Sequence, residues 1–179
     1  MDPDDGQGHG THVAATALGT GGADRVHTGS GMGAFLVDIK VLTDSGGTNS
    51  QASLNGIQWM INNKDTNWGN NDSSRGIDIG SMSFGSLSSP LNPGDEGDNG
   101  SGAEARLVND ARDAGIVCIV AMGNDGTKRV PSPASADGAI SIGAVNDRNT
   151  VNRTDDVMAS YSNSVSYTHL RAHETFAHL

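Results

Sequence analysis

The sequence predicts an α/β protein built on a mostly parallel sheet with helices on both of its faces. Short apolar runs typical of buried strands alternate along the chain with segments whose apolar residues recur at helical spacing. Strands separated by helices indicate parallel pairing through right-handed crossovers. The composition agrees, because 25 glycines and only 4% aromatic residues among 179 suit many tight turns rather than a helical bundle.

The first half of the chain is predicted to alternate helix, strand and helix. Residues 11–18 form a short predicted helix, which the glycine-rich run 19–22 should end. Residues 34–42 follow as a predicted strand. A second helix is expected to begin at a cap on Ser50 and to extend to about Asn63, with one apolar face made by Leu54, Ile57, Met60 and Ile61.

The second half continues the alternation and adds long loops. Polar loops at 65–75 and 86–102 are long enough to indicate a function or a family-specific insertion. The predicted elements are a strand at 77–82, a helix at 103–114 and apolar strands at 116–121 and 139–145.

Charge and composition exclude several classes of function. The net charge of −10 argues against a nucleic-acid partner, because phosphate binding depends on clustered Lys and Arg. No run approaches the roughly 18 to 20 apolar residues that cross a bilayer, and no basic-then-apolar leader precedes Asp2. The lone Cys118 lies in an apolar run and is predicted to be an inert core residue. The oligomeric state is left open.

A histidine flanked by glycines opens the first predicted helix. Residues 8–14 are Gly-His-Gly-Thr-His-Val-Ala. His9 and His12 at i, i+3 fit either a polar helix start or a metal pair, but a zinc site needs further ligands at suitable spacing and no such set is apparent. Small neighbours favour an imidazole that faces a cleft, where His9 takes a proton from a nucleophile and returns it to a leaving group.

Glycine-containing segments also follow predicted strands. Residues 120–126 (Val-Ala-Met-Gly-Asn-Asp-Gly) and 80–85 (Gly-Ser-Met-Ser-Phe-Gly) each end a strand. Ligands bind at the carboxyl ends of strands in open parallel sheets. By itself Asn124 fits a turn residue whose side chain satisfies local backbone groups, and the alternative is an amide that donates to an oxyanion.

Together these segments resemble the subtilisin-like serine proteases in kind and in order. Residues 9–14 resemble the family's catalytic-histidine motif, residues 81–85 one wall of its substrate cleft, and residues 121–126 its oxyanion-hole turn. Other segments similar to the family lie at 37–42, 56–59, 114–117, 131–134, 140–144 and 161–163. We therefore expect a partial peptidase domain at residues 1–163 and a tail without family resemblance at 164–179.

The resemblance implies a role for each matching residue. His9 would be the general base, and the Asn124 side chain would donate to the tetrahedral oxyanion. His12 matches a structural position of the family. The implied substrate-binding residues are Ser83, Phe84 and Gly85, which would pair by backbone with the substrate, and Ala121, Met122 and Gly123, which would line the primary specificity pocket.

The same resemblance implies the setting of the reaction. It predicts protein or peptide substrates, a secreted or extracellular protein, and chemistry that needs no cofactor. Family members often use calcium for stability, but no run of Asp and Asn here has the spacing of a site, so metal ligands stay unassigned.

The sequence also departs from the family pattern. The family order is Asp, then His, then Ser, and Asp2, Asp4 and Asp5 are too close to His9 to match the catalytic aspartate. The nucleophile motif Gly-Thr-Ser-Met-Ala does not occur. We therefore expect a fold that is incomplete at both ends and a 179-residue chain that is inactive by itself.

Other interpretations compete with a peptidase fragment. The glycines at 29–33 are reminiscent of a dinucleotide site, but they precede a predicted strand instead of following one. A non-catalytic module could keep a protease-like cleft and hold extended peptides by strand pairing. The tail resembles translated non-coding or library-derived sequence, and a metal site at His169, His173 and Glu174 is disfavoured.

Overall fold

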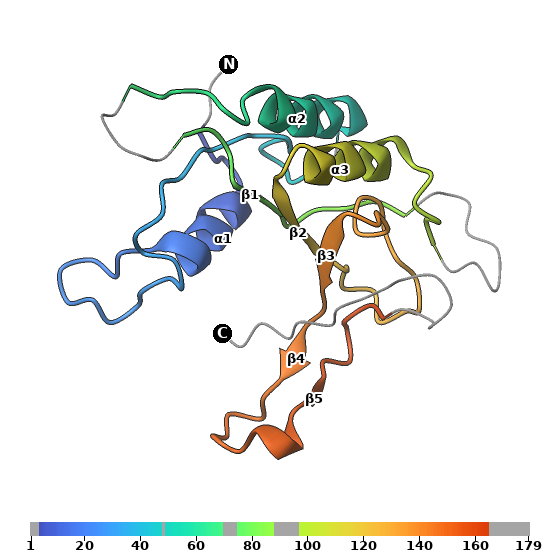
Figure 1. Ribbon diagram of the computed structural model, residues 1–179. Coiled ribbons are helices and arrows are strands. Elements are labelled where there is room, and N and C mark those ends of the chain that lie inside the picture. The colour runs from blue at the N-terminus through green and yellow to red at the C-terminus, as the bar shows by residue number, and fades with distance from the viewer. Residues whose placement is uncertain (1–3, 48, 70–74, 88–96, 165–179) are drawn as a thin grey trace. The chain divides into compact units, whose positions relative to one another are not determined.

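The computed structural model describes residues 4–47, 49–69, 75–87 and 97–164. The chain forms two compact units, Met1–Gly56 and Ile57–Leu179. The elements in chain order are α1 (His9–Leu18), α2 (Ser50–Asn62), β1 (Ile79–Met82), α3 (Ala103–Asp113), β2 (Val117–Ala121), β3 (Ala139–Ile142), β4 (Val145–Asn146), the short 3₁₀ helix η1 (Arg153–Asp155) and β5 (Val157–Met158), as Figure 1 shows.

The sheet of the second unit has three parallel strands in the order β1-β2-β3. Met82 is level with Val120, and Ala121 is level with Ile142. All three strands therefore end at the same edge, where Figure 1 shows loops leaving the sheet. This arrangement confirms the predicted α/β class with a parallel sheet.

Alternation along the strands separates a buried face from an exposed one. Gly80 and Met82 are buried on β1, and Cys118 and Val120 are buried beside them on β2. The Met60 side chain of α2 packs over Gly80, since a Cβ added there would lie 2.9 Å from the Met60 methyl group. On the opposite face Ile79 is 63% exposed. Burial also raises the pKa of the Cys118 thiol, as expected for an unreactive core cysteine.

The helix α3 buries small residues at helical spacing. Ala105, Val108 and Ala111 are fully buried, and α3 packs against β2 and β3. Glu104 in its first turn and Arg112 in its last turn complement the helix dipole. Gly115 follows at φ +90°, a left-handed conformation that favours glycine and turns the chain into β2.

The helix α2 begins at the predicted residue but through a different cap. The side-chain oxygen of Asn49 accepts hydrogen bonds from the backbone N–H groups of Gln51 (3.0 Å) and Ala52 (3.3 Å). Asn49 therefore satisfies free donors at the start of the helix, which corrects the predicted cap at Ser50. Ile57 and Met60 are buried, as the periodicity predicted.

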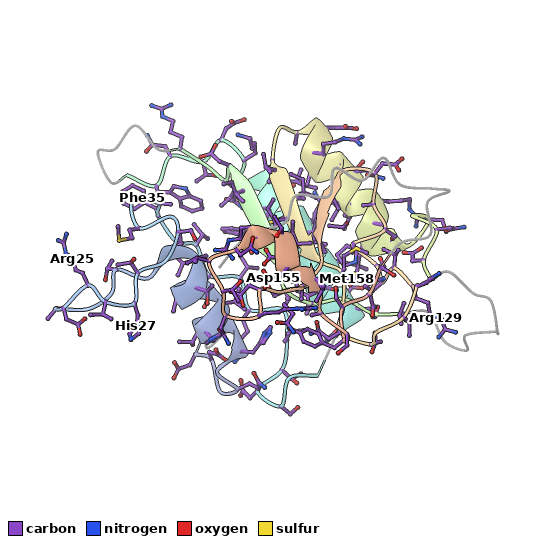
Figure 2. The ribbon with its side chains drawn as sticks, turned by 90° about the horizontal axis from the view of Figure 1, so that it is seen from below. Arg25, His27, Phe35, Arg129, Asp155 and Met158 are labelled. Carbon is purple, nitrogen blue, oxygen red and sulfur yellow. The ribbon has the colours of Figure 1, made fainter. Side chains whose placement is uncertain are left out.

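The predicted strand at 34–42 is not observed. Residues 34–41 form no strand in the part of the chain that the structure describes. Strand formation requires a neighbour for the backbone groups, and apolar pattern alone does not supply one. Phe35, labelled in Figure 2, is accordingly 63% exposed.

The predicted strand at 139–145 is divided in the structure. β3 ends at Ile142, and β4 then pairs antiparallel with β5. The N–H of Ala144 donates to the Ser162 hydroxyl oxygen (3.0 Å) rather than to a neighbouring strand, so the pairing changes between the two elements. Asp155 lies in η1 and Met158 in β5, as labelled in Figure 2, and Met158 is 55% exposed.

Candidate active site

The helix α1 places His9 at its first residue. Gly8 precedes it at φ +91°, a conformation open to glycine, and the His9 N–H donates to the Gln7 side-chain oxygen (2.8 Å). His9 is exposed. The glycine-flanked motif thus places the His9 imidazole, exposed, at the start of α1.

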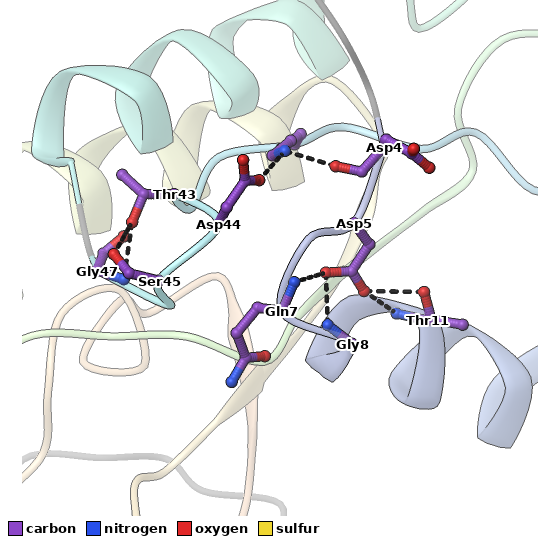
Figure 3. Close-up of polar contacts among 10 residues, drawn as sticks. Asp4, Asp5, Gln7, Gly8, Thr11, Thr43, Asp44, Ser45 and Gly47 are labelled. Carbon is purple, nitrogen blue, oxygen red and sulfur yellow. Dashed lines mark hydrogen bonds and ion pairs between the residues drawn. The ribbon is translucent and has the colours of Figure 1, made fainter.

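The carboxylate of Asp5 organises the chain before this helix, as Figure 3 shows. Its oxygens accept hydrogen bonds from the N–H groups of Gln7 (3.1 Å), Gly8 (2.8 Å) and Thr11 (2.8 Å). The Thr11 hydroxyl donates to the same carboxylate (2.8 Å). Because these bonds satisfy donors of the first turn, the helix begins at His9, two residues before the predicted start at Thr11.

These hydrogen bonds hold the pKa of Asp5 far below its usual value of 3.8, chiefly through the Thr11 and Gly8 N–H groups. The spacing to His9 excluded Asp5 as the catalytic aspartate, and this capping role was not predicted from the sequence. An acidic residue shortly before a helix start was the available signal.

We expect Asp5→Asn to reduce the amide-exchange protection of Gly8 and Thr11 in the full-length protein. The lowered pKa means that the carboxylate stabilises this turn above about pH 4 and loses its effect only as the pH falls through the lowered value. The difference between variant and wild type should thus persist down to pH 4 and shrink in stronger acid. Asp24→Asn is the matched control, since Asp24 accepts a single backbone bond, from Val26. Unchanged protection in Asp5→Asn would contradict the capping role.

A lysine ties the start of the first unit to a later segment. Lys40 donates to the backbone carbonyl of Asp4 and to the Asp44 carboxylate, and it lowers the pKa of Asp44 (Figure 3). The hydroxyl of Thr43 accepts from the Gly47 N–H (3.0 Å) in the adjoining turn. These contacts hold residues 40–47 near the segment that leads to His9.

The other predicted site residues lie in the second unit, where the strands end. Because Met82 is level with Val120, Ser83 and Ala121 leave the sheet side by side at its carboxyl edge. Pro131 adjoins both segments, since a Cβ added at Gly85 would lie 3.2 Å from its ring and one added at Gly123 would lie 3.6 Å away. The structure thus brings residues 83–85 and 121–123 together at the carboxyl edge of the sheet.

Residues 83–85 connect the end of β1 to Ser86 and lie outside any strand. Ser86 exchanges hydrogen bonds with Ser132 (2.9 and 3.0 Å), which fixes the far end of the segment. Within the described ranges, no hydrogen bond is found to the backbone of Phe84 or Gly85. Met122 is only 5% exposed, and its N–H donates to the Ile142 carbonyl (2.9 Å).

The turn after β2 displays Asn124. Gly123 adopts φ +96° and Gly126 φ +64°, so the chain reverses through left-handed conformations that glycine favours. Asn124 is exposed, and in the described part of the chain its side-chain amide makes no hydrogen bond. An asparagine that stabilises its own turn bonds to nearby backbone, and Asn124 makes no such bond with the residues that the structure describes.

In the described ranges, no group of three or more His, Cys, Asp or Glu side chains lies close enough to hold an ion. His12 is exposed on α1. The disfavoured site at His169, His173 and Glu174 lies outside the described residues.

The protein is an α/β protein with an open parallel sheet and a glycine-containing turn at the carboxyl edge, which is the edge where such sheets bind ligands. A sequence model of the subtilase family, peptidase S8, matches residues 1–173. The chain is 33% identical over 164 residues to serine protease AprX of Bacillus subtilis (strain 168). The matched region covers 90% of this chain and 35% of AprX. It is 34% identical over 145 residues to subtilisin DY of Bacillus licheniformis. This match covers 79% of the chain and 44% of subtilisin DY.

Solved structures agree with the sequence comparisons. Sphericase superposes with a TM-score of 0.66 at 30% identity, covering 87% of this chain and 44% of sphericase. The S41 psychrophilic protease gives a TM-score of 0.64 at 25% identity, with the same coverage of both chains. The chain therefore belongs to the subtilase family.

The chain spans less than half the length of these relatives, which places it within part of a subtilase catalytic domain. None of the helices in the described ranges has the length and apolar character that a bilayer crossing requires.

Proposed function

We propose that the full protein containing this chain is a serine endopeptidase that hydrolyses peptide bonds through an acyl-enzyme. The observation that carries the proposal is the turn after β2. It exposes the Asn124 amide without a hydrogen bond in the described residues, next to residues 83–85, which follow β1. A donor left free at a strand end suits a charge that develops only during the reaction.

The substrate would bind as an added strand. Phe84 and Gly85 offer backbone groups that are not bonded within the described residues, and an extended peptide can pair with such an edge. The side chain before the cleaved bond would then enter a pocket at Ala121, Met122 and Gly123. This geometry supports protein and peptide substrates.

The chemistry would begin when a serine from outside these 179 residues attacks the scissile carbonyl carbon. His9 would take the serine proton, and the Asn124 amide would donate a hydrogen bond to the oxyanion that forms. The carbon–nitrogen bond then breaks, and His9 returns the proton to the leaving amine. Water, deprotonated by the same imidazole, would attack the acyl carbon, the bond to the serine oxygen would break, and the imidazole would return the proton to that oxygen. No cofactor takes part in these steps.

The proposal extends to the setting of the enzyme. Family membership supports a secreted protein, and structural calcium is compatible with it. The sequence has no Gly-Thr-Ser-Met-Ala motif, so the 179-residue chain by itself is proposed to be inactive. The same absence favours a second candidate, a non-catalytic peptide-binding module that keeps the cleft.

A serine-directed fluorophosphonate distinguishes the two functions. We expect the full-length protein to be labelled at one serine with loss of peptidase activity, and the 179-residue chain to remain unlabelled. A full-length protein that binds peptides but is neither labelled nor able to hydrolyse them would be the binding module. Stoichiometric labelling of a serine within the 179 residues would refute the assignment of the nucleophile to another part of the protein.

A further inference from the structure

Asn163 is a buried polar residue that contacts the turn after β2. Its side chain is almost fully enclosed, with 1% of the residue exposed. The side-chain oxygen accepts from the N–H groups of Asp125 (2.9 Å) and Thr127 (3.3 Å). The side-chain nitrogen donates to the Asp125 carboxylate (3.3 Å). Every one of these bonds ends on the turn that carries Asn124.

Backbone hydrogen bonds from the segment around Asn163 hold both ends of the same turn. The Asn163 N–H donates to the Gly123 carbonyl (3.0 Å), immediately before Asn124. On the other side, the Gly126 N–H donates to the Tyr161 carbonyl (2.7 Å) and the Ser164 N–H donates to the Thr127 carbonyl (3.0 Å). The turn is therefore bonded before and after Asn124, while the Asn124 amide itself stays free of partners among the described residues.

The segment around Asn163 is hydrogen-bonded to Ala144, which follows β3 at the end of the sheet. The Ser162 hydroxyl accepts from the Ala144 N–H (3.0 Å), just beyond β3, and donates to the Asn163 carbonyl (3.1 Å). The Ala159 N–H donates to the Ala144 carbonyl (2.9 Å). These bonds fix the turn relative to the sheet, and residues 83–85 follow a strand of the same sheet, β1.

The Asn163 side chain lies in close contact with Gly123. A Cβ added at Gly123 would lie 2.7 Å from the Asn163 side-chain nitrogen, and Gly123 itself adopts φ +96°. A side chain at position 123 would therefore displace either Asn163 or the turn. The close contact leaves the turn little freedom to move relative to Asn163.

We infer that Asn163 is a positioning residue that aims the Asn124 amide at the oxyanion. This inference rests on the proposed function. Asn163 is too enclosed to reach a substrate, so it acts through the Asp125 and Thr127 N–H groups that follow Asn124. Preorganised donors stabilise a transition state because they need no reorientation during the reaction, and a small misplacement loses much of that benefit.

The test uses the full-length enzyme, with kcat expressed per active site titrated by a fluorophosphonate. We expect Asn163→Ala to lower kcat roughly 10- to 100-fold with little change in KM, because about 1 Å of misplacement has effects of that order. The double variant Asn163→Ala with Asn124→Leu should be no slower than Asn124→Leu alone, since the two residues act as one unit. An unchanged kcat in Asn163→Ala, or effects that multiply in the double variant, would overturn the inference.

A matched asparagine controls for general destabilisation. Asn109 of α3 accepts a hydrogen bond from the Gly138 N–H (2.7 Å), a similar side-chain bond to backbone away from the turn. Asn109→Ala is expected to lower stability but not kcat per active site. A loss of kcat equal to that of Asn163→Ala would mean that the turn is not specifically involved.

An isosteric exchange applies even if Asn163→Ala yields no folded enzyme. Asn163→Asp keeps the acceptor but brings a second carboxylate oxygen to about the position of the donor that is 3.3 Å from Asp125, so kcat should fall. Adding Asp125→Asn restores a donor and an acceptor to the pair and should recover kcat. Failure of this rescue would overturn the role of Asn163, whereas a fully active Asn124→Leu enzyme would instead overturn the oxyanion role of Asn124.

Discussion

Replacing His9 with alanine should nearly abolish peptide hydrolysis by the full-length enzyme. The imidazole is proposed to move a proton in both half-reactions, so its loss leaves the serine without a base and the amine without an acid. The expected fall in kcat is roughly a millionfold, which is the magnitude measured for subtilisin, a member of the same family. Single-turnover kinetics with an activated peptide ester would measure the residual rate.

His12 provides the control on the same helix. It lies three residues after His9 on α1, is exposed, and matches a structural position of the family. His12→Ala should change the stability of the enzyme more than its kcat per titrated site. Retention of full activity by His9→Ala would remove the histidine from the mechanism and, with it, the interpretation of residues 8–14.

Replacing Asn124 with leucine should lower kcat and leave KM nearly unchanged. The amide has no partner among the described residues and would acquire one mainly in the transition state, so ground-state binding should not depend on it. The expected loss is roughly 100- to 1,000-fold, the size measured when one oxyanion donor is removed from subtilisin itself. Steady-state kinetics on a peptide anilide would separate the two constants.

An asparagine with an ordinary turn role makes the comparison specific. The Asn67 side chain accepts from the Gly69 N–H (3.0 Å), which is the kind of local bond that Asn124 lacks among the described residues. Asn67→Leu should therefore affect stability and not kcat. If Asn124→Leu behaved in the same way, Asn124 would be only a turn residue and the proposed oxyanion site would have to be withdrawn.

The amino-acid sequence by itself determined the class of fold and the local form of the site. The apolar run at 116–121 became β2 and the first part of the run at 139–145 became β3, because such segments must be buried and can pair in parallel within a sheet. Glycines at 8, 123 and 126 took left-handed conformations that were needed where the chain turns beside His9 and Asn124. The apolar pattern was sufficient to predict these strands, whereas the left-handed conformation of each glycine is an observation of the structure.

Features that depend on distant partners were decided only by the tertiary structure. The apolar run at 34–42 has the composition of a strand, but residues 34–41 pair with no described segment, and pattern cannot show which partner a strand finds. Asn49 caps α2 and Asp5 caps α1 because these are the side chains that reach the free N–H groups in the folded chain. Asn163 bonds to a residue 38 positions earlier in the chain, and no local signal marks that contact. Folding brings these residues together because buried polar groups must find partners wherever the packing places them.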